Sequence, residues 1–330
     1  LTSATSSPRT ETTDFYQKTT LPNGVRVVTS RMNHVHSATV IFNYNVGSRW
    51  EFEPHAGISH VLEHMLFKGT EKRPDPATIS EEIEGVGGIL NAATGRESTN
   101  YWAKVPAGKL ELAFDVLADI LRHSTFPDDE LEKERLVIFE EIRGIVDTPD
   151  DLVHDIIDEV IWDNQPVGRS IIGTEETVGA IQADDLRAFL DRYYRPDRLV
   201  IAVAGKVDHD QVVELADRYF GDMTPAEPSV ITASIFQHTA PHVRLVNRPT
   251  EQAHLCIGHP ALPYTDERRY TQGMIDAILS SGMSSRLFQE IRERRGLVSS
   301  LFGYFPEYAP VGQGVVYART HLQPIHQTTP

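Results

Sequence analysis

The stretch His60-Val61-Leu62-Glu63-His64, with Ser59 before it and Met65-Leu66-Phe67 after it, decides the fold and the chemistry expected of this chain. Apolar and polar residues alternate here at spacings of three and four, which predicts a helix. Residues four apart on a helix lie one turn apart on the same face. The imidazoles of His60 and His64 can therefore close on one metal ion.

Glu63 follows His60 by three residues on the same side of this helix, so its carboxylate can reach an open coordination position rather than the ion itself. H-x-x-E-H is the reverse of H-E-x-x-H and is the signature of inverted zinc peptidases. In such sites the metal lowers the pKa of a water, and a carboxylate takes its proton as the water attacks a carbonyl. The alternative is a partly exposed helix with two solvated histidines. The apolar neighbours favour burial, and buried ionisable groups need partners.

The composition is that of an ordinary globular protein. The chain has 330 residues, of which 40% are hydrophobic and 24% charged, and its length favours two domains. No apolar run approaches the length of a membrane span. The formal net charge of -16 argues against nucleic-acid binding, because a polyanion would be repelled. The densest basic stretch, residues 292–295, also contains Glu293.

A single cysteine, Cys256, excludes a disulfide within the chain and is compatible with a reducing compartment. It lies in an apolar run, which predicts a buried structural thiol. Residues 1–14 are rich in Ser and Thr, and we expect them to be disordered. They lack the apolar core of a signal peptide and, with one arginine, match a transit peptide poorly. We therefore expect a cytoplasmic bacterial protein, with the mitochondrial matrix as the alternative compartment.

The metal-binding helix is expected to pack against a sheet. Residues 24–29 and 38–44 are predicted strands that lead into it, because they are rich in β-branched or aromatic residues and bounded by turn formers. Residues 89–94 and 100–105 are predicted to follow as strands. The first of these, with Asn91 and Ala92, could be an edge strand that pairs with an extended peptide. A plain connecting strand is the alternative.

Two predicted helices, residues 109–123 and 128–146, come next. In the second, Glu134 and Glu141 fall two turns apart on the apolar face. Carboxylates within a buried stripe call for a cation, which a zinc ion would provide. A catalytic zinc takes three protein ligands and keeps a fourth position for water. Glu141 is the expected third ligand, and Glu134 is expected to orient a ligand from the outer shell.

Three segments in this order resemble the pitrilysin family (M16) of zinc metallopeptidases, which includes insulin-degrading enzyme and mitochondrial processing peptidase. They are HVLEHMLFKGT from His60, LNAATGRE from Leu90 and ERLVIFEE from Glu134. The resemblance extends from about residue 15 to about residue 318, and the shorter bacterial processing-peptidase-like members are the most similar. It implies one zinc ion per chain, bound by His60, His64 and Glu141. It also implies that Glu63 is the general base and that Glu134 is a further catalytic acid.

The resemblance also implies the residues that bind substrate. The family's substrate-pairing strand carries an Asn-Ala pair, which falls on Asn91 and Ala92 and favours the edge-strand interpretation. A family arginine that holds substrate falls on Arg292, for which an exposed helix arginine is the alternative. The tyrosine expected seven residues later is Ser299, which is too short to replace a phenol. Losing one oxyanion donor costs about 2.7 to 4 kcal/mol in the transition state.

The expected fold is α+β, with two related domains that each have a mostly antiparallel sheet packed by helices. We expect a disordered segment at residues 1–14, a zinc-binding peptidase domain at 15–223, a linker at 224–242 and a second domain at 243–330. Residues 243–247 and 253–257 are predicted strands of this second domain. Its pattern loses strand periodicity after Ala318, so we expect it to be incomplete at its C-terminus.

The resulting functional expectation is a zinc endopeptidase acting on short or unfolded peptides, with no nucleic-acid or membrane partner. The rival is a non-catalytic or weakly active assembly subunit that pairs with a second M16-type chain, in a homodimer or heterodimer. A structural zinc site is a third possibility, but it would leave Glu63 without a role.

Overall fold

The computed structural model describes residues 9–13, 15–163, 165–225 and 234–321. These residues form two compact units, one from Leu1–Phe139 with Ile171–Val230 and one from Glu140–Ser170 with Ile231–Pro330. The division falls inside one continuous helix, α4 (Asp128–Asp147). The domain expected at residues 15–223 therefore contains a segment that packs with the second unit, and part of the expected linker lies outside the described residues.

The first unit is built on a seven-stranded sheet with the order β1-β2-β3-β7-β4-β6-β5. All neighbouring pairs are antiparallel except β3 and β7, which run parallel. Its strands are β1 (Arg9–Thr12), β2 (Gln17–Thr20), β3 (Arg26–Arg31), β4 (Ser37–Tyr44), β5 (Ile89–Thr94), β6 (Thr99–Pro106) and β7 (Leu199–Gly205). Strand β5 lies at one end of this order, so the expected edge strand at residues 89–94 is confirmed.

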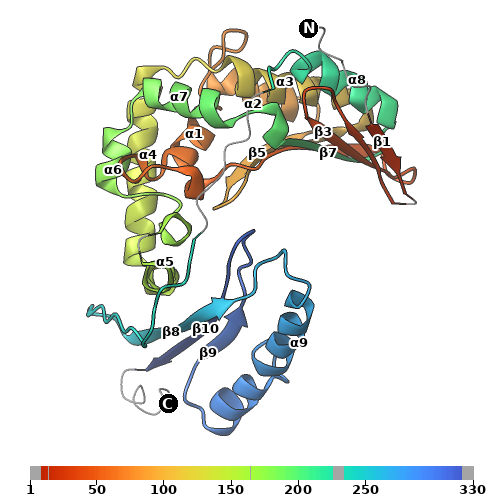
Figure 1. The fold of residues 1–330 in the computed structure, drawn as a ribbon. Coiled ribbons are helices and arrows are strands. Elements are labelled where there is room, and N and C mark those ends of the chain that lie inside the picture. The colour runs from red at the N-terminus through yellow and green to blue at the C-terminus, as the bar shows by residue number, and fades with distance from the viewer. Residues whose placement is uncertain (1–8, 14, 164, 226–233, 322–330) are drawn as a thin grey trace, which may run out of the picture. The chain divides into compact units, whose positions relative to one another are not determined.

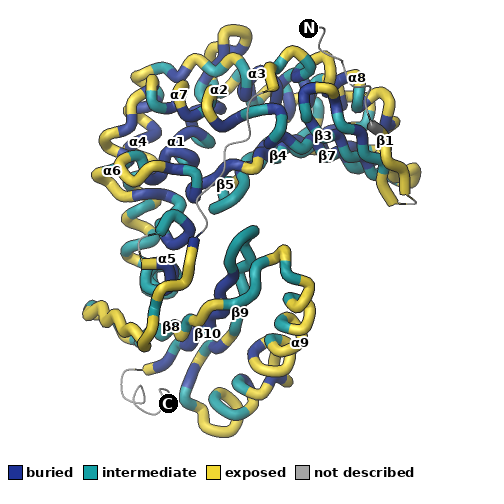
Figure 2. Tube along the Cα trace, viewed as in Figure 1, coloured by how far each residue is buried: buried dark blue, intermediate teal, exposed yellow. Residues whose placement is uncertain are grey.

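Helices cover one face of this sheet (Figure 1). They are α1 (Ile58–Met65), α2 (Pro76–Glu84), α3 (Leu110–His123), α7 (Ala183–Tyr193) and α8 (His209–Phe220), with the short α6 (Glu175–Ala180) beside them. Phe42 of β4 packs edge to face against Phe114 of α3 and Phe220 of α8, with ring centroids 5.2 and 5.1 Å apart. Figure 2 shows the resulting buried layer between helices and sheet. Strand and helix periodicities in the sequence predict this layer because each element buries one face.

The second unit has a three-stranded antiparallel sheet with the order β8-β10-β9. Its elements are α5 (Pro149–Trp162), β8 (Gln252–Ala261), α9 (Arg269–Leu279), β9 (Ser300–Tyr304) and β10 (Gly312–His321). Helix α5 packs Ile161 and Trp162 on Val315 of β10. On the other face of the sheet, Leu301 and Ala318 pack with residues from the 287–298 segment. The unit therefore has a small core on each face of its sheet.

Three sequence-based expectations are wrong within the described residues. Residues 9–12 are not disordered but form β1, where Thr10 Oγ1 lies 2.8 Å from Thr19 Oγ1 on β2. Residues 243–247 form no strand, because Val243 and Leu245 are exposed and no described strand pairs with them. Strand pairing continues to His321 rather than ending at Ala318.

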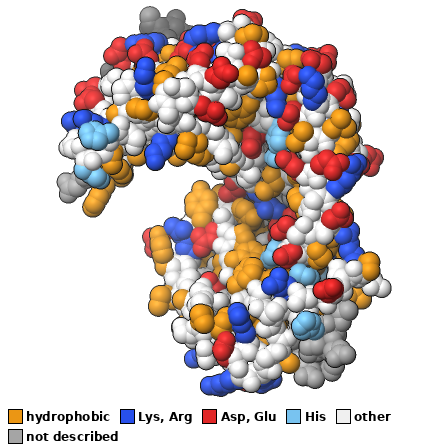
Figure 3. All heavy atoms as spheres, turned by 180° about the vertical axis from the view of Figure 1, so that it is seen from behind, with side chains coloured by type: hydrophobic (Ala, Val, Ile, Leu, Met, Phe, Trp, Pro, Cys, Tyr) orange, Lys and Arg blue, Asp and Glu red, His pale blue; other side chains and the backbone are white. Residues whose placement is uncertain are grey.

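No helix among the described residues is both long enough and apolar enough to cross a lipid bilayer. On the face drawn in Figure 3, acidic and basic side chains of the described residues are interspersed and do not form an extended basic stripe.

A buried histidine joins helix α8 to the sheet through hydrogen bonds. This contact predicts how the stability of the protein depends on pH. His209 is 6% exposed, and its ring nitrogens lie 2.8 Å from the hydroxyls of Thr19 and Thr29. Burial lowers the pKa of His209 below its ordinary value of 6.5, although Asp210 and Asp208 oppose the shift. The unfolded chain therefore binds this proton first as the pH falls. The contribution of His209 to stability is present above about pH 6.5 and is lost as the pH falls through its lower folded-state pKa.

We expect the urea midpoint of the wild-type protein to fall between about pH 7.5 and pH 5.5. His209→Gln should have a lower midpoint at pH 7.5 and a flatter pH dependence. His36→Gln, at an exposed histidine, is the matched control and should keep the wild-type slope. Equal slopes for His209→Gln and wild type would contradict this account.

The single cysteine generates a second prediction. Cys256 lies on β8 and is half-buried rather than buried as expected from the sequence, with its Sγ 3.8 Å from Nδ1 of His154. Burial, with a smaller contribution from Asp158, raises the pKa of the Cys256 thiol to about 12. At pH 8 only about one thiol in ten thousand is then ionised. Iodoacetamide should label the native protein far more slowly than the urea-unfolded chain, as followed by mass spectrometry, and equal rates would refute a raised thiol pKa in the folded protein.

Candidate metal centre

Helix α1 begins at a point that only glycine fits and that a buried carboxylate caps. Gly57 precedes the helix with φ 94°, and a Cβ on it would lie 2.6 Å from the carbonyl oxygen of Ile172. Glu51, 5% exposed, accepts hydrogen bonds from the backbone N–H groups of Gly57 at 2.7 Å and Ser59 at 2.9 Å. These bonds satisfy helix-end donors and place negative charge at the positive end of the helix dipole.

The two histidines of α1 face one point. Leu62 and Met65 are fully buried, which leaves His60 and His64 half-buried on the opposite side of the helix. Their Nε2 atoms lie 3.3 Å apart. Two nitrogens bound to a tetrahedral ion at about 2.0 to 2.1 Å are about 3.3 Å apart, so this spacing fits one metal ion. Burial, and then the neighbouring His64, lower the pKa of His60 to about 4, which keeps it in the neutral form that binds metals.

Glu134 lies behind His64. Its Oε2 accepts a hydrogen bond from Nδ1 of His64 at 2.9 Å, and its Oε1 lies 2.6 Å from Nζ of Lys68. Because a carboxylate only accepts, neutral His64 carries its proton on Nδ1 and presents an unprotonated Nε2 toward His60. Burial opposes ionisation of Glu134, but the hydrogen bonds from Lys68 and His64 outweigh it and lower the pKa of this carboxyl.

Glu141 joins the two histidines from α4. One ligand atom from each of His60, His64 and Glu141 lies within 4.8 Å of the other two. Helix α4 carries Glu141 two turns after Glu134, so both acids reach α1 from one helix face. Glu134 is buried as the apolar stripe predicts, but Glu141 is exposed. The stripe ends near Phe139, where the packed part of the first unit ends.

Glu63 is half-buried on α1 and accepts a hydrogen bond from Oγ1 of Thr94, the last residue of β5. Behind it, the hydroxyls of Tyr101 and Tyr194 lie 3.0 Å apart. Burial, then the neighbouring Tyr194 and the charge of Glu63, raise the pKa of Tyr101 well above its ordinary value. The phenols therefore stay neutral beside the carboxylate at neutral pH.

Asn91 and Ala92 lie on β5, at the edge of the sheet. Ala92 is opposite Tyr101 of β6, and within the described residues β5 pairs with no second strand. Asn91 is exposed, and its Oδ1 accepts a hydrogen bond from the backbone N–H of Ala92 at 2.8 Å. The outer edge of β5 can therefore accept main-chain hydrogen bonds from an extended chain.

Arg292 and Ser299 belong to the second unit. Arg292 lies in a π-helical segment, Phe288–Arg294, with its guanidinium 4.8 Å from the ring centroid of Phe288. The Ser299 hydroxyl donates to the carbonyl oxygen of Arg319 at 3.2 Å. The substrate-binding role of Arg292 stays a prediction.

Sequence reasoning did not find Glu51, Lys68 and Thr94, which all contact the centre or its helix. Each of these side chains contacts a different loop, helix or strand, and no local spacing of residues predicts such a contact. The only sign in the sequence that Lys68 contributes to the site is its position close to the H-x-x-E-H motif, because its partner Glu134 lies far along the chain.

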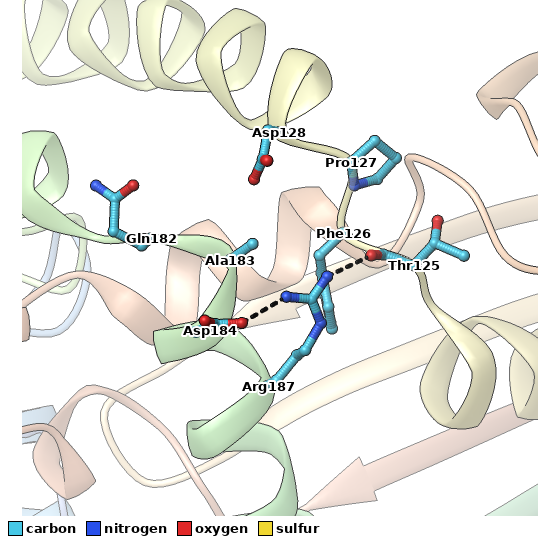
Figure 4. Close-up of a pocket in the computed structure, with 8 residues that line it drawn as sticks. All are labelled: Thr125, Phe126, Pro127, Asp128, Gln182, Ala183, Asp184 and Arg187. Carbon is cyan, nitrogen blue, oxygen red and sulfur yellow. Dashed lines mark hydrogen bonds and ion pairs between the residues drawn. The ribbon is translucent and has the colours of Figure 1, made fainter.

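A hollow of about 530 Å³ elsewhere in the first unit is lined by none of these residues. Figure 4 shows it between the start of α4 and the start of α7. Arg187 there donates hydrogen bonds of 2.8 Å to Asp184 Oδ1 and to the carbonyl oxygen of Thr125. The charged group of Arg187 is thus already engaged by residues that line the hollow.

Comparison with known proteins identifies the family. Residues 26–175 match the family described as Insulinase (Peptidase family M16), and residues 180–326 match the Peptidase M16 inactive domain. An uncharacterized zinc protease of Streptomyces coelicolor is 41% identical over 316 residues, covering 94% of this chain and 69% of that protein. An uncharacterized zinc protease of Bacillus subtilis is 39% identical, covering 93% of this chain and 74% of that protein. The chain belongs to peptidase family M16.

Solved structures show the same fold at low sequence identity. A protease from Helicobacter pylori has a TM-score of 0.85 at 22% identity, covering 96% of this chain and 76% of that chain. Pitrilysin has a TM-score of 0.75 at 19% identity, covering 98% of this chain and 36% of that chain. The mixed helix-and-sheet architecture expected from the sequence is therefore confirmed.

Proposed function

We propose that this chain is a zinc-dependent endopeptidase that hydrolyses short or unfolded peptides. One observation carries the proposal: the ligand atoms of His60, His64 and Glu141 converge within 4.8 Å, with the two Nε2 atoms 3.3 Å apart. The relatives named zinc proteases support zinc as the ion, since two imidazoles and a carboxylate are a common catalytic zinc set. When bound, zinc would act as a Lewis acid on a peptide carbonyl and lower the pKa of a water.

The residues around this set have separate roles in the proposal. His64 is held in its metal-binding tautomer by Glu134, whose charge is balanced by Lys68. Glu63 takes the proton of the attacking water and passes it to the leaving amine. The nearby neutral phenols of Tyr101 and Tyr194 do not compete for that proton.

Strand β5 is the proposed binding element for the peptide. An extended segment adds beside Asn91 and Ala92 through main-chain hydrogen bonds, which favour any unfolded peptide over a folded one. Arg292 is the further residue proposed to bind substrate.

The rival proposal is an assembly subunit with little or no turnover, and Ser299 favours it, because its hydroxyl cannot replace a phenol at that position. We also propose that the chain pairs with a second M16-type chain, in a homodimer or heterodimer. Helix α9 supports such a partner, since Tyr270, Met274 and Ile278 are 68%, 65% and 49% exposed. Digestion of a quenched peptide library with and without chelator separates the enzyme from the subunit.

Zinc binding should depend on both histidines. His60→Ala and His64→Ala should each lower zinc from about one ion per chain to near zero after dialysis, because two protein ligands do not hold the ion. Glu141→Gln should weaken binding, since a neutral amide replaces an anionic ligand. Elemental analysis and competition with a chromogenic chelator give the measurement. His36→Ala is the control, and full zinc binding by His64→Ala would remove the proposed site.

Glu63→Gln should separate metal binding from chemistry. We expect zinc content to stay unchanged and peptide hydrolysis to fall at least about 100-fold, because general-base catalysis is lost. Glu84→Gln, at an exposed position of α2, should retain the wild-type rate. Near-normal hydrolysis by zinc-loaded Glu63→Gln would rule out the assigned base.

A further inference from the structure

Thr94 contacts the proposed general base from the end of the edge strand. Its Oγ1 donates a hydrogen bond to Oε2 of Glu63, because a carboxylate oxygen can only accept. Glu63 is carried by α1 and Thr94 is the last residue of β5. The bond therefore joins the helix that supplies the base to the strand that is proposed to bind the peptide.

The hydrogen bond from Thr94 restrains the side chain of Glu63. A glutamate has several side-chain torsions, and they must be ordered before its carboxylate can take a proton from a defined direction. Ordering them in advance removes that cost from the reaction. A donor on a rigid strand can do this, whereas a water molecule cannot.

The inner side of β5 is rigid near Thr94. Thr94 is opposite Thr99, which is fully buried and donates from Oγ1 to the carbonyl oxygen of Val46 at 2.9 Å. The turn that follows is closed by Gly95 N–H donating to the carbonyl oxygen of Ser98 at 2.8 Å. The outer side of β5 has no partner strand among the described residues. A paired peptide would therefore restrain the strand from its second side.

We propose that Thr94 is a positioning residue that orients the carboxylate of Glu63, and that pairing of an extended peptide along β5 strengthens this restraint. The inference rests on the proposed function. If Thr94 acts in this way, peptide residues remote from the cleaved bond contribute binding energy that raises kcat rather than lowering KM. A long peptide should then turn over faster than a short one with the same cleaved bond.

Two variants of Thr94 test this. Thr94→Val keeps the β-branched shape but removes the hydroxyl, and Thr94→Ser keeps the hydroxyl. Thr39→Val is the matched control, because Thr39 is a half-buried threonine on β4 of the same sheet. Each protein is assayed on two internally quenched peptides with the same cleaved bond. One is confined to the residues flanking that bond, and the other is long enough to extend along β5. Zinc content and the thermal unfolding midpoint are measured on the same samples.

We expect Thr94→Val to lower kcat on the long peptide about tenfold or more, with KM, zinc content and unfolding midpoint close to wild type. The kcat advantage of the long peptide should disappear. Thr94→Ser should restore most of both effects, and Thr39→Val should leave them intact. A Thr94→Val rate within about twofold of wild type, or a retained length effect, would overturn the inference. So would equal losses in Thr94→Ser and Thr94→Val, because these would indicate a packing role.

The two hypotheses fail separately in this design. The proposed function fails if the wild-type protein cleaves neither peptide, or if Glu63→Gln cleaves both peptides as fast as the wild-type protein does. The inference then fails with it. If wild type requires Glu63 but Thr94→Val behaves as wild type, only the positioning role fails.

Discussion

The hydrogen bond from Nδ1 of His64 to Glu134 is the contact on which the rest of the centre depends. It joins α1 to α4 across 70 residues of sequence, and it determines which nitrogen of His64 faces the position shared with His60. Burying a carboxylate is costly unless it is paired, and Lys68 supplies the compensating charge at 2.6 Å. With α4 held in this way, the same helix face carries Glu141 to the histidines two turns later. The centre is thus an arrangement of two helices rather than a property of one motif.

The sheet of the first unit borders this two-helix arrangement. Strand β5, which has no partner strand on its outer side among the described residues, lies beside the helix that carries the histidines, and Thr94 connects β5 directly to Glu63. Helix α1 is itself anchored through Glu51 and the left-handed Gly57. The proposed metal ligands, base and substrate edge therefore sit on regular helices and a strand, which suits chemistry that tolerates little displacement. Membership of peptidase family M16 agrees with this layout, and every residue of the candidate metal centre falls within the region that matches the insulinase description.

Secondary structure near the motif was predictable because each element there follows a local rule. The strands at β3, β4 and β6 and the helices α1, α3 and α4 have apolar periodicities that tertiary packing did not override. The secondary-structure predictions that are wrong lie where pairing between distant segments determines whether a strand forms. Polar residues 9–12 form β1 because β2 offers a partner, and the apolar stretch at 243–247 forms no strand because none of the described strands pairs with it. Strand propensity expresses packing against neighbours, which a local pattern does not contain.

For the site, the sequence alone determined which residue types share a helix face: His60 with His64, and Glu134 with Glu141. Helical geometry is local, so a spacing of four or seven residues is enough to infer it. Only the tertiary structure decided that these two faces meet. It places Glu134 against Nδ1 of His64 and a ligand atom of Glu141 within 4.8 Å of one from each histidine, and it places Lys68 and Thr94 against Glu134 and Glu63. Those contacts depend on how helices and strands pack over long chain distances, and burial, charge compensation and the geometry of the sheet select among arrangements that the same sequence pattern would allow.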